Sequence, residues 1–199
     1  MGTHTDFTGA IRITPCVAEP LATKLQEFMD IRHMRRNVEQ LHKLFPDPEE
    51  RKELSLFGDG DFGEEGAFFL PRETKDFFPR PSESGPYPEA IDAQNGLNLP
   101  PEPCPSLYCD LVLLHDKQRN CSYLGWNEAE KSYYITDWIE LIASWLAPRG
   151  YHLDGKMFAV VEGGMSFYSI TVQDAEVTSE EFEPEVTYWP EFNELLYED

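Results

Sequence analysis

A chain of 199 residues, of which 41% are hydrophobic and 13% aromatic, can bury a sizeable core, and this composition excludes disorder throughout. The net charge of −21 argues against direct binding to nucleic acid, because an acidic protein repels phosphate backbones. Four cysteines are too few for a disulfide scaffold, no apolar run is long enough to span a membrane, and the N-terminus lacks a signal-peptide pattern. We therefore expect a protein of the bacterial or host cytoplasm.

The N-terminal part predicts a strand followed by a helical region. Residues 10–13 alternate between apolar and polar types, which is typical of a short strand. Pro20 suits the first position of a helix, and apolar residues recur at helical spacing over residues 21–44, up to Pro46. The spacing weakens over residues 30–36, so either one bent helix or two helices are expected.

Residues 46–105 differ from the rest in composition. They contain eleven of the sixteen prolines and six glycines, which favours irregular chain. They also contain seven aromatic residues, which a linker does not need. We expect an ordered insertion that packs on the core or on a partner.

The second half predicts two hairpins with a helix between them. Residues 107–114 and 121–126 form the first pair of strands. A capping box at 137–140 precedes a strongly amphipathic helix that ends by Pro148. Residues 157–162 and 165–173, joined by two glycines, form the second pair.

This order of elements predicts an α+β fold. The economical packing is an antiparallel sheet with two helices on one face, ferredoxin-like or a close variant. We expect a single domain over residues 1–173, which includes the insertion at 46–105. Residues 174–199 are expected to form an acidic aromatic tail.

The negative charge is concentrated late in the chain. Residues 120–199 carry sixteen acids and three bases, with no Lys or Arg after Lys156. Carboxylates spaced by rings can dock on a basic surface, or can imitate a phosphate backbone, although the tail could instead cover the domain's own core. The candidate partner-binding residues are Glu180, Glu181, Glu183, Glu185, Tyr188, Trp189 and Glu191.

Three pieces of the sequence carry a family resemblance: Gly2 to Ile13, residues 126–147 beginning Trp-Asn-Glu-Ala-Glu-Lys-Ser-Tyr-Tyr, and the terminal hairpin from Leu153. Together they resemble a family of small uncharacterised proteins of bacteria, phages and plasmids. The resemblance implies no activity and no site residues. Its mobile-element setting favours proteins that act on host or phage machinery. The insertion and the acidic tail depart from the shorter members.

The favoured function is a non-enzymatic acidic binding protein. It would occlude a basic nucleic-acid-binding site on a partner such as a nuclease, as an anti-CRISPR-like inhibitor does. No catalytic motif, cofactor or metal site is predicted. One alternative is a small-molecule enzyme whose pocket, between sheet and insertion, holds His115 with Asp110 or Asp116. Another is an oligomeric assembly protein that buries the aromatic insertion. The sequence leaves the oligomeric state open.

Two metal-like patterns have simpler explanations. Cys104, Cys109 and Cys121 with His115 lack the second closely spaced ligand pair of a zinc site, so small buried thiols are expected. Residues 59–65 begin like a calcium loop but have Gly at its fifth position and Glu at its sixth, so an exposed turn is expected.

Three histidines and one group of basic residues are further candidates for functional residues. His33, His42 and His152 have no nucleophile motif beside them, which favours ordinary surface or core positions. The basic cluster comprises Arg32, His33, Arg35, Arg36 and Lys43. It either pairs with acids of the same fold or binds an acidic partner or a phosphate.

Overall fold

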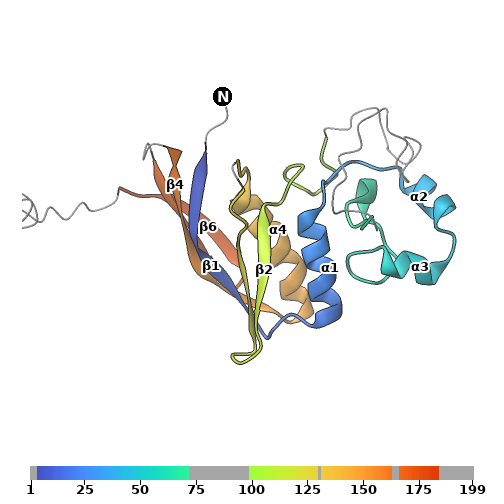
Figure 1. The fold of residues 1–199 in the computed structure, drawn as a ribbon, viewed down its shortest axis with the longest axis horizontal. Coiled ribbons are helices and arrows are strands. Elements are labelled where there is room, and N and C mark those ends of the chain that lie inside the picture. The colour runs from blue at the N-terminus through green and yellow to red at the C-terminus, as the bar shows by residue number, and fades with distance from the viewer. Residues whose placement is uncertain (1–3, 72–98, 130, 163–165, 184–199) are drawn as a thin grey trace, which may run out of the picture.

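The computed structural model describes residues 4–71, 99–129, 131–162 and 166–183, and these residues form an α+β fold (Figure 1). Its strands make one antiparallel sheet in the order β2-β3-β1-β4-β5-β6. The strands are β1 (Thr5–Thr14), β2 (Leu111–Asp116), β3 (Cys121–Trp126), β4 (His152–Val161), β5 (Phe167–Gln173) and β6 (Glu176–Glu181). The helices are α1 (Glu19–Asp30), α2 (Val38–Leu44), α3 (Pro48–Glu53) and α4 (Ile135–Leu146). The predicted fold class and antiparallel sheet are confirmed.

The two predicted hairpins form, and one further strand extends the sheet. β2 pairs with β3, and β4 pairs with β5. β6 was not predicted as a strand, because residues 176–181 had been assigned to the acidic tail. It pairs with β5 along six residues and forms one edge of the sheet.

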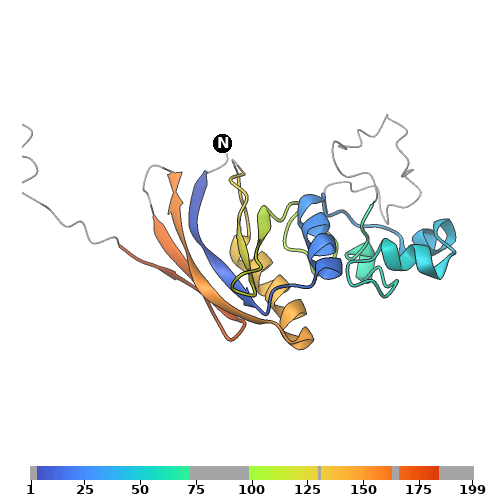
Figure 2. The same ribbon diagram turned by 60° about the horizontal axis from the view of Figure 1, so that its bottom comes forward.

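The two longest strands, β1 and β4, lie at the centre of the sheet and curve along their length (Figure 2). Each contains a glycine where the neighbouring backbone comes close. A Cβ on Gly155 would lie 2.6 Å from the carbonyl oxygen of Ala10, and a Cβ on Gly9 would collide with the carbonyl oxygen of Lys156. Only glycine lets the two backbones approach in this way.

The hydrophobic core contains residues of the sheet, of α1 and of α4. In α1 the buried residues recur at helical spacing from Ala22 to Met29, and α1 lies along β2. In α4 almost every residue facing the sheet is buried, and α4 lies along β6. The Phe28 ring of α1 meets the fully buried Trp138 of α4 at a centroid distance of 6.0 Å. Burial of these apolar stripes is the main force that holds the layers together.

The predicted helical region is two helices, α1 and α2, separated by residues 31–37. In that segment the backbone N–H groups bond outward, from His33 to the carbonyl of Leu107 and from Arg36 to that of Glu65. α2 then begins at Asn37, whose side chain accepts a hydrogen bond from the Gln40 N–H at 3.1 Å. The break therefore ties the helical region to the insertion.

The predicted start of α4 was wrong by three residues, because the N-cap is Tyr134 and not Asp137. The helix begins at Ile135 after Tyr134, which has a left-handed backbone (φ 61°) and makes no side-chain cap. Asp137 lies in the first turn, where its charge suits the helix dipole, but it is not the N-cap. No described helix is long and apolar enough to cross a membrane.

The described part of the insertion packs on the core. Phe57 and Phe68 contact Trp145 of α4, with ring centroids 5.8 and 5.3 Å away. A second small core forms beneath α2 and contains Leu41, Leu54, Phe62 and Phe69. The predicted insertion residues from 72 to 98 lie outside the described residues.

Candidate partner-binding surface

No described helix covers the outer face of the sheet, which is the face away from the core (Figure 2). Side chains alternate along a strand, so the residues between the buried ones of β1 and β4 point outward. The strand register places Thr8 opposite Phe158 and Asp6 opposite Val160 on this face. Phe158 is 42% exposed and Val160 39%, and neighbouring exposed apolar residues mark candidate interaction sites.

Three phenylalanines on this face form a group that we call the aromatic cluster: Phe158, Phe167 and Phe182. The ring of Phe182 lies 5.9 Å from that of Phe158 and 6.1 Å from that of Phe167. A backbone hydrogen bond of 3.0 Å from the Phe182 N–H to the Phe167 carbonyl fixes Phe182 just beyond β6. Phe182 still remains 38% exposed, so the cluster presents apolar rings to the solvent.

The carboxylates of β6, together with the one that follows Phe182, form a group that we call the acidic edge: Glu176, Glu180, Glu181 and Glu183. All four are exposed. Glu180 pairs with Ser169, and Ser169 pairs with Phe158, so the register places Glu180 on the outer face in one row with the cluster. Within the described residues, no ion pair involves a member of the acidic edge. Their charges are therefore available to a partner.

Of the predicted contact residues, the structure places Glu180, Glu181 and Glu183 at this edge. Glu185, Tyr188, Trp189 and Glu191 lie outside the described residues. The aromatic cluster was not predicted. The sequence features that could have indicated this cluster are Phe182 within the acidic run and Phe158 at an outward position of a predicted strand.

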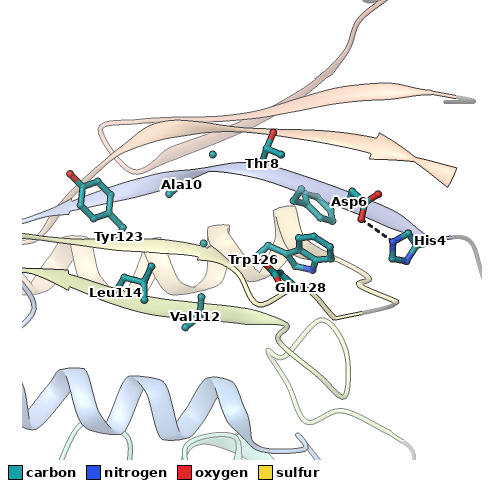
Figure 3. A pocket seen from close by; sticks show the side chains of 12 residues that line it. His4, Asp6, Thr8, Ala10, Val112, Leu114, Tyr123, Trp126 and Glu128 are labelled. Carbon is teal, nitrogen blue, oxygen red and sulfur yellow. Dashed lines mark hydrogen bonds and ion pairs between the residues drawn. The ribbon is translucent and has the colours of Figure 1, made fainter. Parts of the chain in front are cut away.

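A hollow of about 460 Å³ adjoins the aromatic cluster on the same face. Figure 3 shows Leu114 and Tyr123 at one end and the His4–Asp6 pair, 2.9 Å between Nε2 and Oδ1, at the other. Thr8, which lines the hollow, pairs with Phe158 of the cluster. Leu114 is 57% exposed. The near-continuous apolar run over residues 107–114 is typical of a strand covered on both faces, yet only one face of β2 is covered by described residues.

The cations of the outer face are already engaged. Arg12 of β1 binds the carboxylate of Asp154 in β4 through two contacts, at 3.1 and 3.2 Å. Lys156 lies over the ring of Phe158 with its Nζ 5.3 Å from the centroid. Arg12 is neutralised by its partner, whereas Lys156 keeps its positive charge beside the aromatic cluster.

The basic cluster does not form a single cationic surface. Arg35 pairs with Glu65 at 3.0 Å, and Arg36 is buried with its guanidinium over the Phe69 ring. His33 is buried, and this burial lowers its pKa to about 3, with the Arg36 charge as a smaller cause. The arrangement favours the interpretation in which these residues serve their own fold.

The residues of the predicted enzymatic alternative are separated. His115 Nδ1 hydrogen-bonds Ser122 Oγ at 3.0 Å, whereas Asp116 accepts backbone N–H groups of its own turn. Asp110 is half-buried, which raises the pKa of its carboxyl, but it does not line the hollow. The hollow itself lies on the outer face and not under the insertion.

The metal-like patterns are used in other ways. Cys104, Cys109 and Cys121 are buried, and no three metal-ligating side chains gather among the described residues. In the loop at 59–65, Asp59 accepts the N–H of Asp61, and Asp61 accepts that of Gly63. These carboxylates stabilise turns.

Comparisons with protein-family models, with curated proteins and with solved structures gave no match to this chain.

Proposed function

We propose that this chain is a non-enzymatic acidic binding protein that occludes a basic nucleic-acid-binding site on a partner. The observation that carries the proposal is the aromatic cluster beside the acidic edge. Exposed rings together with carboxylates that no ion pair engages within the described part of the chain combine the two elements of a charged protein interface. The nuclease, anti-CRISPR-like form of the proposal rests in addition on the sequence resemblance to proteins of phages and plasmids.

The two groups would act differently on binding. Phe158 and Phe182 would supply affinity, because large rings that lose water at the centre of an interface contribute most of its free energy. Glu176, Glu180 and Glu181 would supply steering and choice of partner, because a negative surface accelerates encounter with a basic one. On the partner, a site lined by Lys and Arg would then bind the carboxylates of this chain in place of the phosphates of a nucleic acid.

We also propose that the core is ferredoxin-like, with both helices on one face of the sheet. The support is the chain order β1, α1, β2, β3, α4, β4 with these strands arranged as β2-β3-β1-β4. β5 and β6 extend this sheet beyond β4, which puts the acidic edge on added strands.

The test is displacement of DNA from purified CRISPR nucleases of several types, each loaded with guide RNA and a fluorescent target duplex. Wild-type chain is expected to displace DNA from at least one nuclease. Phe158→Ser with Phe182→Ser, and separately a triple Glu→Gln variant at 176, 180 and 181, are expected to lose this effect. A matched triple variant removes three exposed acids from helices: Glu27→Gln, Glu39→Gln and Glu140→Gln.

Two results would overturn the proposal. Displacement that is equal in the acidic-edge and helix variants would show that net charge, not this surface, acts. If the chain displaces DNA from none of the nucleases, the anti-CRISPR form of the proposal is wrong. The alternative occupant of the outer face is a second copy of the chain. In that case light scattering on the same samples would detect a dimer, and Phe158→Ser would dissociate it.

A further inference from the structure

We propose that Cys16, His115 and Ser122 form a thiol site at which Cys16 reacts with small-molecule disulfides. The site lies at the β2 end of the sheet, whereas the acidic edge lies at the β6 end. It is therefore independent of the proposed binding function.

The three side chains come from separate parts of the chain. Cys16 lies between β1 and α1, His115 in β2 and Ser122 in β3. The Cys16 Sγ is 3.5 Å from Nδ1 of His115 and 3.4 Å from Oγ of Ser122. Ser122 Oγ is also 3.0 Å from His115 Nδ1, so the three polar atoms form a closed triangle.

The hydrogen-bond donors of this triangle suit a thiolate. Ser122 Oγ accepts the backbone N–H of Val17 at 3.0 Å, which leaves its own hydrogen to be donated. When Nδ1 of His115 accepts the thiol proton, it becomes a donor to the sulfur. The Ser122 hydroxyl can turn toward the same sulfur. The thiolate then has two donors without movement of any heavy atom.

A second cysteine–histidine pair among the described residues lies in a different environment, away from solvent. The Cys104 Sγ is 3.8 Å from Nδ1 of His33, and both residues are buried. Burial raises the pKa of Cys104 to about 12 and lowers that of His33 to about 3, so this pair stays neutral. Cys16 is only partly buried and His115 is exposed, so both side chains border the solvent.

The groups around the site are polar and accessible. Lys117 pairs with Glu19 at 3.0 Å, and this pairing together with the nearby His115 lowers the pKa of the Glu19 carboxyl. Both residues of the pair are exposed. A small disulfide with charged arms, of the kind of glutathione disulfide, matches this surface.

The reaction is a thiol–disulfide exchange. The Cys16 thiol gives its proton to His115, and the thiolate attacks one sulfur of the disulfide. A new S–S bond forms at Cys16 as the original S–S bond breaks. The departing thiolate takes the proton from His115, so Cys16 is oxidised and one half of the reagent is reduced to a thiol.

The test follows the reaction of the full chain with glutathione disulfide by intact mass and peptide mapping. Cys16 is expected to react first, about tenfold faster than the same cysteine in a synthetic peptide of residues 12–20. His115→Gln, at an exposed position, is expected to slow Cys16 to the rate of the peptide. His42→Gln, at an exposed histidine in α2, is expected to react like wild type.

A Cys16 rate no higher than that of the peptide would overturn the proposal. So would a His115→Gln rate equal to that of wild type, with the thermal melt confirming that the variant is folded. Cys16→Ser is expected to leave no fast-reacting thiol. Modification that continues in this variant at the original rate would assign the reaction to another cysteine and would also contradict the proposal.

Discussion

The imidazole of His33 lies against the indole of Trp138, with ring centroids 4.7 Å apart. The Phe28 ring contacts the same imidazole at 4.4 Å. A residue of the apparent basic cluster is thus part of the aromatic core that joins α1 to α4. Because this environment disfavours a charged imidazole, His33 affects the pH dependence of stability and does not contribute a positive charge to the surface.

Acidification is expected to destabilise the protein through His33. Its folded pKa of about 3 is below the value of about 6.5 in an unfolded chain, so between these pH values the unfolded state binds the extra proton. The free energy of unfolding should therefore fall as the pH drops from 6.5 toward 3, by about 1.4 kcal/mol per pH unit from this group. Urea unfolding at a series of pH values measures the slope.

The control for this slope uses two variants. His33→Leu removes the titrating group and should flatten the decline relative to wild type. His152→Gln changes an exposed histidine and should leave the decline unchanged. If His33→Leu and wild type lose stability in parallel, His33 is not the source.

Trp138→Ala is expected to be the most damaging of the core substitutions named here. Trp138 is fully buried, and its Nε1 donates a hydrogen bond of 2.9 Å to Ser106 Oγ. Loss of the side chain leaves a large cavity, which should cost about 3–5 kcal/mol of unfolding free energy. Ser106→Ala removes this hydrogen bond and the one of 2.7 Å that Ser106 Oγ donates to the Tyr108 carbonyl, and it should cost about 1–3 kcal/mol. Thermal and urea melts of both variants test the order.

Gly155→Ala is expected to destabilise the centre of the sheet by about 2 kcal/mol. The new Cβ would lie 2.6 Å from the Ala10 carbonyl, and backbone cannot move aside cheaply. Gly125→Ala in β3 is the matched control, because a Cβ there meets no atom within 4 Å. Equal urea midpoints for the two variants would contradict the close approach of β1 and β4.

Phe158→Ser is expected to weaken partner binding about tenfold or more while it changes the free energy of unfolding by less than about 1 kcal/mol. The reason is that the ring is already 42% exposed in the isolated chain. Tyr133→Ser, at an aromatic residue 47% exposed outside the outer face, should change neither quantity. Calorimetry with the responding nuclease, beside a thermal melt, separates binding from stability.

The affinity for a basic partner is expected to fall as salt rises, because ions screen exposed charges. Removal of Glu176, Glu180 and Glu181 as Gln should flatten this dependence as well as lower the affinity. The helix variant at Glu27, Glu39 and Glu140 should keep the wild-type slope. A slope that is unchanged in the acidic-edge variant would place the electrostatic contact elsewhere.

The sequence by itself determined the local features of this protein. Alternation and helical spacing fix which face of a strand or helix is apolar, and these patterns located both hairpins, α1 and α4. The charge distribution likewise placed the acids of residues 174–183 away from any base. Such features depend on neighbours in the chain, so a single sequence contains them.

Only the tertiary structure decided which distant residues meet. β6 became a strand because β5 offered an edge, although its acidic sequence gave no strand pattern. His33 became a core residue because Phe28 and Trp138 enclose it. Phe158 and Phe182 approach each other, as do Cys16 and His115, because sheet register joins segments that are far apart in the chain. Register arises from packing of the whole core, and for that reason the aromatic cluster and the thiol site were absent from the sequence prediction.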